Sequence, residues 1–535
     1  MKLLVTDPLS EEGLKLLTQS GIPVDVKPGL TEDELCQVID GYDGVIIRSG
    51  TTITAKVIDA GKSLKVIGRA GVGVDNVDVP HATRKGILVM NTPSANIISA
   101  AEHSLAMMMA LARNVVWAHN SMHAGKWERS KFTGTELFGK TLGILGVGRV
   151  GGEVAKRAKS FNMKLLGYDP YLPADIAENL DVKLTTVEEV ISQSDILTIH
   201  APLTTATKDM IGKKQFEMMK PHALLINVAR GGIVNEEALY EALNNNRIAG
   251  AAFDVFVEEP LPSDSNLMQL PNLITTPHLG ASTKEAQEKV SVEMAEHMIM
   301  FMRDGIISNA INAPRGRLDP EVAPFVPLAE TLANFAHQAL GERPVDKIEV
   351  KVHGDIAAYE TRMVTLSAVI GLMSNIMGEA TNIINAESLA KAKGIEVVET
   401  KTDSCSHYNN MLTVKLTSGK ESKEVRGTVF PADKQRIVGM DDFVIELPLD
   451  SNFFMAVYKD GPGVIGRIGR VLGENGINIA QMSVGREGPD GNALMLMGVD
   501  HLVNDAVLEQ IKESGSFVTA RFIRLLGGEE RTYMS

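Results

Sequence analysis

Three glycines, Gly146, Gly148 and Gly151, constrain this chain more than any other feature of its sequence. They follow an apolar run, residues 142–145, that predicts a buried parallel strand, and a helical pattern comes directly after them. A second apolar run then ends at Asp169. In such a unit the first glycine makes a tight turn, the second lets the backbone approach a pyrophosphate, and the third allows close packing of helix on strand. The stretch therefore predicts a dinucleotide-binding βαβ unit.

The residue that ends the second strand indicates which dinucleotide binds. Asp169 stands where an acidic side chain can accept hydrogen bonds from the adenosine ribose hydroxyls. Residues 170–172 contain no Arg or Lys that would favour a 2′-phosphate, so the pattern favours NAD over NADP. The free N–H groups at the start of the helix suit the pyrophosphate. An ordinary glycine-rich turn would explain the glycines, but not the strand, helix and acid in this order.

The bulk composition is that of a globular protein. The chain has 535 residues, of which 44% are hydrophobic and 22% charged, which predicts about three or four domains. Its net charge of −14 argues against a nucleic-acid or anionic-membrane partner. The two cysteines, Cys36 and Cys405, cannot form a disulfide framework and fit a reducing compartment. The start, MKLLVTD, does not resemble a signal peptide and no apolar run is long enough to span a bilayer, so we expect a cytoplasmic protein.

The first 98 residues alternate strand-like and helical segments, which predicts a doubly wound α/β domain. Two of its strands end in residues suited to an anion: Arg48 and Ser49 follow one, and Gly71, Val72 and Gly73 follow another. In open α/β sheets, ligands bind beyond the carboxyl ends of the strands. Backbone N–H groups of the glycine turn can hold an anion there, with Arg48 as a clamp. A plain turn with a surface arginine is the alternative.

Residues 95–119 have a helical pattern and are expected to form one long, mostly buried helix. A basic segment, residues 125–131, follows it. By default this segment is a solvated loop, but its Arg129 and Lys131 could reach a neighbouring active site.

Three later strands also end in chemically distinctive residues. Arg230 follows one of them, Glu259 lies just beyond the next, and His278 follows the last. Each residue alone is more often structural than functional. Because the carboxyl ends of parallel strands meet at one edge of a sheet, the ordered set can converge on a single crevice.

The motifs that carry these residues resemble a known family. GVGRVG, NVARGGIVNEEAL, DVFVEEP and PHLGAST are similar to motifs of the D-2-hydroxyacid dehydrogenases. RSGTTIT, GRAGVGVDNVD, KGILVMNTP and GKWERSKFTGTEL resemble the phosphoglycerate dehydrogenase branch of that family. The resemblance covers essentially the whole chain. It implies a Rossmann NAD-binding domain inserted into a flavodoxin-like α/β substrate domain.

The last part of the chain resembles the long form of that branch. A βαββαβ pattern begins near residue 452, and KDGPGVIGRIGRVLGENGINI is similar to ACT domains, which are small ligand-sensing modules. An α+β intervening domain is expected before it. The expected divisions are 1–98 (substrate domain, first part), 99–289 (NAD-binding), 290–313 (substrate domain, return helix), 314–450 (intervening) and 451–535 (ACT).

The resemblance implies oxidation of 3-phospho-D-glycerate to 3-phosphooxypyruvate by hydride transfer to NAD, the first step of L-serine biosynthesis. The residue chemistry supports it. An alcohol gives up hydride as its hydroxyl proton leaves, so a base is needed, and His278 suits that role. Glu259 can accept the other imidazole N–H, and Arg230 can hold the substrate carboxylate. The substrate phosphate brings nearly two further negative charges, for which Arg48, Arg129 and Lys131 are the expected cations.

Further site residues are expected around these groups, and no metal site is. The expected cofactor contacts are Gly146, Gly148, Arg149, Val150, Gly151, Asp169, Ala201, Val228, Ala229, Arg230, Asp254, His278, Gly280 and Ala281. The expected substrate contacts are Arg48, Ser49, Gly71, Val72, Gly73, Arg129 and Lys131. In the ACT module, Asp460, Gly463, Asn475 and Asn478 are expected to bind an effector, for which the resemblance favours L-serine. A homo-oligomer, either dimer or tetramer, is expected.

Two other functions remain open on the sequence alone. The first is a dehydrogenase of the same family acting on another 2-hydroxy acid, such as 2-hydroxyglutarate. The second is a catalytically inactive, ACT-containing NAD sensor or corepressor, against which the intact Arg230, Glu259 and His278 argue.

Overall fold

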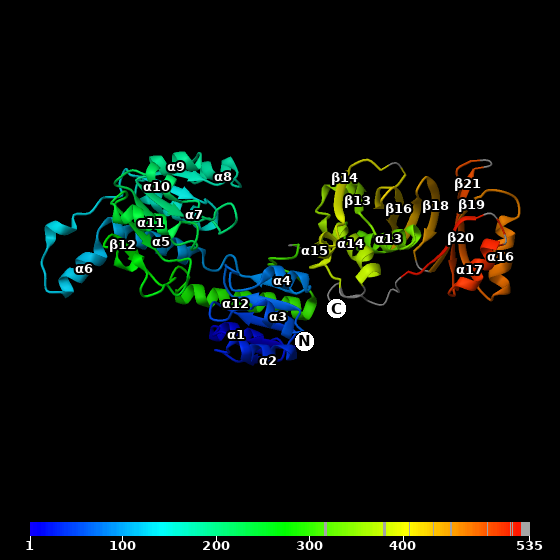
Figure 1. Ribbon diagram of the computed structural model, residues 1–535, viewed down its shortest axis with the longest axis horizontal. Coiled ribbons are helices and arrows are strands. Elements are labelled where there is room, and N and C mark those ends of the chain that lie inside the picture. The colour runs from blue at the N-terminus through cyan, green and yellow to red at the C-terminus, as the bar shows by residue number, and fades with distance from the viewer. Residues whose placement is uncertain are drawn as a thin grey trace.

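The computed structural model describes residues 1–314, 318–377, 381–405, 407–431, 433–449, 452–488, 491–513, 515 and 517–525. The molecule is elongated, with two α/β domains at one end and two further sheet domains at the other (Figure 1). This is the α/β class with appended α+β and ACT domains that the sequence predicts. No helix among the described residues is both long enough and apolar enough to cross a membrane.

The first sheet has five parallel strands in the order β2-β1-β3-β4-β5, the flavodoxin-like order. Its strands are β1 (Leu3–Val5), β2 (Val24–Val26), β3 (Gly44–Ile47), β4 (Val66–Arg69) and β5 (Leu88–Asn91), with helices α1 (Glu11–Gln19), α2 (Glu32–Val38), α3 (Ala55–Ala60) and α4 (Val79–Arg84). Strands β1, β3 and β5 are buried throughout, and β4 is buried except at Arg69, as expected for a parallel sheet covered on both faces.

The second sheet has seven parallel strands in the order β12-β11-β10-β9-β6-β7-β8. Its strands are β6 (Thr141–Leu145), β7 (Lys164–Tyr168), β8 (Val182–Leu184), β9 (Ile196–Ile199), β10 (Leu224–Asn227), β11 (Gly250–Phe253) and β12 (Leu273–Thr275). Its helices are α5 (Ile97–Ala112), α7 (Arg149–Ser160), α8 (Ala174–Asn179), α9 (Val187–Gln193), α10 (Lys213–Met218) and α11 (Glu236–Asn244). The strand order reverses between β6 and β9, which is where a doubly wound sheet binds its dinucleotide.

The chain crosses between these two domains near residue 92 and again at α12 (Lys284–Asp304). Helix α12 packs closely on the first domain because small residues face it. A Cβ added at Gly13 would lie 2.9 Å from Ser291 Cβ, and one at Gly68 would lie 2.6 Å from Met294 Sδ. The domain division expected at residues 289 and 290 falls inside this single helix.

The long helix expected over residues 95–119 is two helices. Asn114 adopts the left-handed conformation at φ +51°, which asparagine tolerates better than most residues, and it ends α5. Helix α6 (Val115–His123) then projects as an arm from the NAD-binding domain (Figure 1). None of its residues is buried. The arm continues through a 3₁₀ turn, η2 (Arg129–Phe132).

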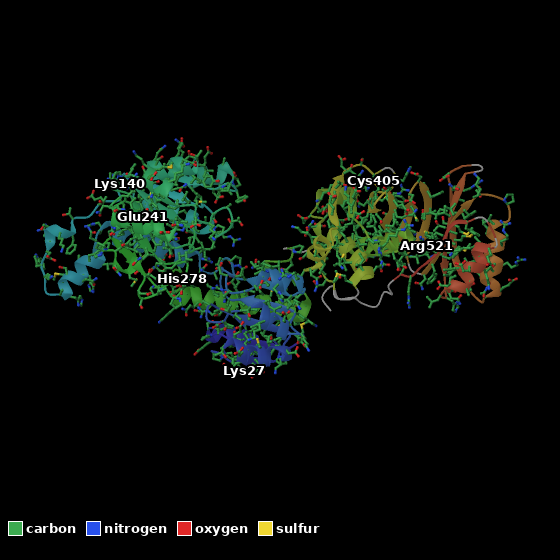
Figure 2. All side chains as sticks on the ribbon, in the orientation of Figure 1. Lys27, Lys140, Glu241, His278, Cys405 and Arg521 are labelled. Carbon is green, nitrogen blue, oxygen red and sulfur yellow. The ribbon has the colours of Figure 1, made fainter. Side chains whose placement is uncertain are left out.

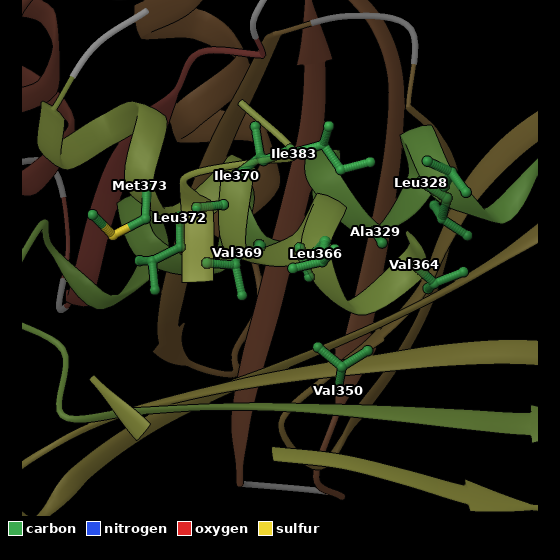
Figure 3. Close-up of a cluster of buried hydrophobic side chains, with 14 of the residues drawn as sticks. Leu328, Ala329, Val350, Val364, Leu366, Val369, Ile370, Leu372, Met373 and Ile383 are labelled. Atoms are coloured by element: carbon green, nitrogen blue, oxygen red, sulfur yellow. The ribbon is translucent and has the colours of Figure 1, made fainter. Parts of the chain in front are cut away.

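The intervening domain has a mostly antiparallel sheet in the order β14-β13-β15-β16-β17-β18, covered by helices. Its elements are α13 (Phe325–Leu340), β13 (Lys347–Gly354), α14 (Arg362–Met377), α15 (Ala386–Ala392), β14 (Glu396–Thr402), β15 (Asn410–Ser418), β16 (Glu421–Phe430), β17 (Lys434–Met440) and β18 (Phe443–Pro448). Helical side chains including Leu366 and Val369 gather over Val350 of the sheet to form its core (Figure 3).

The C-terminal domain is a four-stranded sheet in the order β20-β21-β19-β22. Its elements are β19 (Asn452–Lys459), α16 (Val464–Glu474), β20 (Ile479–Arg486), β21 (Asn492–Val499), α17 (Asp505–Glu513) and β22 (Phe517–Ile523), which confirms the βαββαβ pattern. Helices α16 and α17 cover one face. On the other face Phe453 meets Phe335 of α13, with the ring centroids 5.8 Å apart, and Arg524 exchanges two hydrogen bonds with Gln338. Both faces of this sheet are therefore packed within one chain.

Candidate active site

The glycine loop has the geometry that a pyrophosphate requires. Gly146 lies at φ +89°, and a Cβ there would be 2.8 Å from the backbone of His200 and Ala201. A Cβ at Gly151 would be 2.0 Å from the carbonyl oxygen of Gly146. Gly148 is the N-cap of α7; a Cβ at Gly148 would meet open space, and no side chain caps the helix. The first turn of α7 thus offers free N–H groups toward an open surface.

The other expected cofactor residues lie along the same edge of the sheet. Asp169 directly follows β7, and its carboxylate accepts hydrogen bonds from the N–H groups of Val147 (3.0 Å) and Tyr171 (2.9 Å). A carboxylate has lone pairs beyond these two for ribose hydroxyls. Arg149 donates to the carbonyl of Pro93 at the first domain crossing (3.3 Å). The rest follow strands β9 to β12 or lie in the α7 turn: Ala201, Val228, Ala229, Asp254, Gly280, Ala281 and Val150. These residues fit NAD.

His278 and Glu259 form a close pair. His278 Nδ1 lies 2.6 Å from Glu259 Oε2, and the other carboxylate oxygen accepts the N–H of Phe256 at 3.0 Å. Burial raises the pKa of the Glu259 carboxyl, but the hydrogen bonds from His278 and Phe256 outweigh it, so the net pKa is lowered. Glu259 is therefore a carboxylate at neutral pH. Figure 2 shows His278 on the side of the NAD-binding domain that faces the substrate domain.

Asp254 holds the loop that carries His278. Its carboxylate is fully buried and accepts hydrogen bonds from the N–H groups of Leu279 (2.7 Å) and Gly280 (2.8 Å). Thr276 Oγ1 donates to it at 2.5 Å. Burial raises the pKa of Asp254, yet these hydrogen bonds and one from His103 lower it below its usual value. Asp254 thus fixes the loop that carries His278, and it also lies at the edge of the sheet where the cofactor is expected to bind.

Arg230 reaches across to the substrate domain. Its Nε donates to Asp75 Oδ2 at 3.2 Å, and its Nη1 donates to its neighbour's carbonyl, that of Ala229, at 2.7 Å. A Cβ at Gly73 would lie 2.2 Å from Arg230 Nη2, so this approach depends on glycine at that position. The structure thus brings Arg230 beside the glycine turn expected to bind an anion.

A cavity of about 750 Å³ lies between the two domains and is lined both by residues expected to be catalytic and by residues expected to bind an anion. Its lining includes Arg48, Ser49, Arg69, Gly71, Glu259 and His278. Of the other expected substrate contacts, Val72 uses its carbonyl to accept from Asn91 Nδ2 at 2.6 Å, and Gly73 faces Arg230.

Arg69 was not among the expected site residues. It ends β4, and burial, followed by repulsion from Arg230, lowers its pKa to about 10. The available signal was its position, because Arg69 is the last residue of its strand and Arg48 directly follows the neighbouring strand. The burial that makes Arg69 notable arises only in the folded domain.

The loop that carries Arg48 is fixed from two sides. Asp7 Oδ2 accepts the N–H groups of Arg48 (2.6 Å) and Thr51 (3.2 Å). Asn76 Nδ2 donates to the carbonyl oxygens of the same two residues, at 2.6 Å each. Asn76 belongs to the turn that follows Gly73, so it ties together the two loops that are expected to bind an anion.

Arg129 and Lys131 do not line this cavity. Both lie on η2 of the arm, and Lys131 pairs with Glu128 at 3.7 Å over a separate hollow between the arm and the NAD-binding domain. Within one chain the structure does not bring these two cations to His278.

The four expected effector residues do not form one pocket within a chain either. Asp460, which binds Arg486 (Nε to Oδ2, 2.5 Å), and Gly463 lie at the start of α16. Asn475 and Asn478 lie beyond its other end, about 16 Å away for a helix of 11 residues. Asn478 Nδ2 donates to Asp500 at 2.7 Å.

The chain matches three family models along its length. Residues 105–280 match the D-isomer specific 2-hydroxyacid dehydrogenase NAD-binding domain. Residues 321–441 match the D-3-phosphoglycerate dehydrogenase intervening domain, and residues 455–515 match the ACT domain.

Relatives match the whole chain as well. It is 41% identical to the D-3-phosphoglycerate dehydrogenase of Archaeoglobus fulgidus, over 98% of this chain and 100% of that protein. It is 42% identical to that of Methanocaldococcus jannaschii, over 96% and 98%. Among solved structures, D-lactate dehydrogenase from Aquifex aeolicus complexed with NAD and lactic acid is 25% identical with a TM-score of 0.53, covering 59% of this chain and 100% of that one. The chain belongs to the D-3-phosphoglycerate dehydrogenase family.

Proposed function

We propose that this protein catalyses the NAD-dependent oxidation of 3-phospho-D-glycerate to 3-phosphooxypyruvate, the first step of L-serine biosynthesis. The observation that carries the proposal is the cavity in which the His278–Glu259 pair meets Arg48 and Arg69. A phosphorylated hydroxy acid carries a carboxylate and a phosphate, so it needs a base and several cations in one place.

Both cysteines are unpaired, which supports a cytoplasmic location.

The base is His278. Its Nδ1 is engaged by Glu259, which leaves Nε2 to accept the proton of the substrate hydroxyl. Bound NAD supplies the hydride acceptor. As the proton arrives, the imidazole becomes a cation, and the adjacent Glu259 carboxylate stabilises it. Arg230 holds the substrate carboxylate by charge-assisted hydrogen bonds, while Asp75 fixes the guanidinium through Nε.

The arginines decide which hydroxy acid is accepted. Arg48 and Arg69 both line the cavity. A substrate that lacks a phosphate would not need these two cations. A phosphate contributes nearly two charges at neutral pH, which offsets the repulsion among the guanidinium groups. The alternative substrate 2-hydroxyglutarate offers one charge at that end instead of two.

We expect kcat/KM for 3-phospho-D-glycerate to exceed that for D-glycerate, D-lactate and D-2-hydroxyglutarate by at least about a hundredfold, given about 1.5 to 3 kcal/mol for each charge-assisted hydrogen bond lost. NADH formation at saturating NAD measures each value. A higher value for 2-hydroxyglutarate would replace the proposed substrate, and no turnover of any of the four would favour an NAD sensor.

Removing the base should leave binding intact and abolish most turnover. We expect His278→Asn to lower kcat by about two to four orders of magnitude, the range of general acid–base catalysis. Glu259→Gln should be milder, because the imidazolium loses its negative partner while the base itself remains. His81→Asn, which alters an ion-paired histidine outside the site, is the control. A kcat near normal in His278→Asn contradicts the assignment.

The arm supports a second proposal, that the protein is a homo-oligomer in which the arm of one copy reaches the cavity of another. Arg129 and Lys131 lie on an arm whose helix has no buried residue. Trp127 is 80% exposed and Met122 53%. Exposed apolar side chains gathered on one segment mark an interaction surface. A second copy would cover them and would supply two more cations to the phosphate.

Complementation tests this arrangement. An Arg129→Ala/Lys131→Ala chain and a His278→Asn chain, each nearly inactive alone, are co-expressed. In a mixed dimer one of the two cavities has an intact His278 and receives an intact arm. Because about half of the co-expressed dimers are mixed, about a quarter of the wild-type activity should return. No recovery in verified mixed dimers would show that the arm does not act on its partner's cavity.

We propose further that L-serine binds the ACT domain and inhibits the enzyme. The free N–H groups near Gly463 suit a carboxylate, and the amides of Asn475 and Asn478 suit the amino group and hydroxyl. Since these pairs lie at opposite ends of α16, a site that uses both needs two ACT domains side by side. A ligand there acts only by binding one arrangement of the whole chain more tightly than another.

Point variants test the effector site better than truncation, because the ACT sheet covers Phe335 of α13. We expect millimolar L-serine, but not D-serine, to inhibit the intact enzyme. Asn478→Ala should raise the inhibitory concentration at least about tenfold with kcat unchanged, equivalent to about 1.4 kcal/mol. Asn492→Ala in the same domain is the matched control. If L-serine neither binds nor inhibits the intact protein, the ACT domain has no serine site.

A further inference from the structure

The catalytic histidine lies on a strained turn. His278 adopts φ +56°, the left-handed region that non-glycine residues rarely occupy. Its N–H donates to the main-chain carbonyl of Asp254 at 2.9 Å. The side chain of Asp254 then binds Thr276, Leu279 and Gly280 on either side of it. The conformation of His278 therefore depends on where the Asp254 carboxylate is held.

His103 holds that carboxylate from the other side. Its Nε2 lies 3.2 Å from Asp254 Oδ1 and 3.2 Å from Thr276 Oγ1. The Thr276 hydroxyl donates to Asp254, and the imidazole N–H of His103 points at both residues. His103, Thr276 and Asp254 therefore form one hydrogen-bonded network. His103 is not a lining residue of the substrate cavity, and its side chain is only 19% exposed. Its position suits an indirect role and not proton exchange with substrate.

The helix that carries His103 also meets both crossings between the two domains. Helix α5 begins at Ile97, directly after the first crossing. Ser99, one turn before His103, bonds through Oγ to Thr283 Oγ1 at 2.8 Å, and Thr283 is the N-cap of α12. Contacts from the first two turns of α5 thus fix the positions of Asp254, the 276–280 loop and α12.

We propose that His103 is a positioning residue for the reaction: by donating Nε2–H to Asp254, it fixes the 276–280 loop so that His278 faces the substrate hydroxyl. The proposal rests on the oxidoreductase activity proposed above. Glu259 binds the imidazole of His278 directly, whereas His103 positions His278 indirectly, through Asp254. A histidine that merely fills space on α5 would have no such effect.

Three variants separate the hydrogen bond from the shape of the side chain. In His103→Gln the amide nitrogen occupies roughly the place of Nε2 and can still donate to Asp254. In His103→Asn the nitrogen matches Nδ1 and falls short, and in His103→Leu no donor is left. His81→Leu is the matched control, because His81 Nε2 pairs with Asp59 at 3.0 Å and its side chain is 17% exposed, but it lies in the substrate domain away from the loop.

We expect His103→Gln to keep kcat within about threefold of the wild type, while His103→Asn and His103→Leu lose about 10- to 100-fold, the effect of misplacing a catalytic group by about 1 Å. The KM for 3-phospho-D-glycerate should change less than about twofold in all three, because Arg48 and Arg69 are untouched. Equal kcat values in His103→Gln and His103→Asn, whether both high or both low, would overturn the proposal.

A second measurement does not depend on activity. Amide hydrogen exchange of the peptide containing Leu279 and Gly280 should be faster in His103→Asn than in His103→Gln, because those N–H groups donate to Asp254. If the wild-type chain oxidises none of the hydroxy acids, the proposed function fails, while this exchange difference still decides whether His103 holds the loop. Identical exchange in the two variants would refute the role of His103.

Discussion

The gathering of three guanidinium groups is the constraint on which the rest of the site depends. Arg48 and Arg69 line one cavity, and burial, followed by repulsion from Arg230, lowers the pKa of Arg69. In a protein of net charge −14 these cations are gathered where a doubly charged phosphate and a carboxylate would bind. Until substrate arrives, the surrounding acids hold the arrangement: Asp7 binds the Arg48 loop and Asp75 binds Arg230. Local structure, not overall charge, therefore determines what this cavity attracts.

The parts of the site that follow strand ends could be predicted from the sequence. Periodicity locates a parallel strand, and the strand end locates its residues on one edge of the sheet; this is how Arg230, Glu259, His278 and Asp169 were identified. The structure places His278 Nδ1 2.6 Å from Glu259 Oε2, and the catalytic roles of the two residues stay predictions. The fold class of all four domains followed from the same patterns and from the family motifs.

Other features needed the folded chain. The break at Asn114 depends on one residue in the left-handed region, which helical periodicity does not detect. The importance of Arg69 arises from its burial in the folded domain, and that of His103 from the approach of α5 to a loop more than 150 residues later. Asn475 and Asn478 are close to Gly463 in sequence, but a straight helix separates them in space. For Arg69 and His103 the deciding neighbours lie far away in the sequence, so a local pattern does not reveal them.

Helix α12 links the position of the first domain to the loop that carries His278. It begins at Lys284, a few residues after His278, and its 21 residues span about 31 Å. Its middle is embedded in the first domain through Ser291 and Met294, so it turns with that domain as a rigid rod. Lys284 lies ten residues before Met294, about 15 Å along the helix, so a rotation of about 5° about Met294 moves that end by roughly 1 Å. A small swing of the substrate domain would therefore reach the base at the scale on which proton transfer is made or broken.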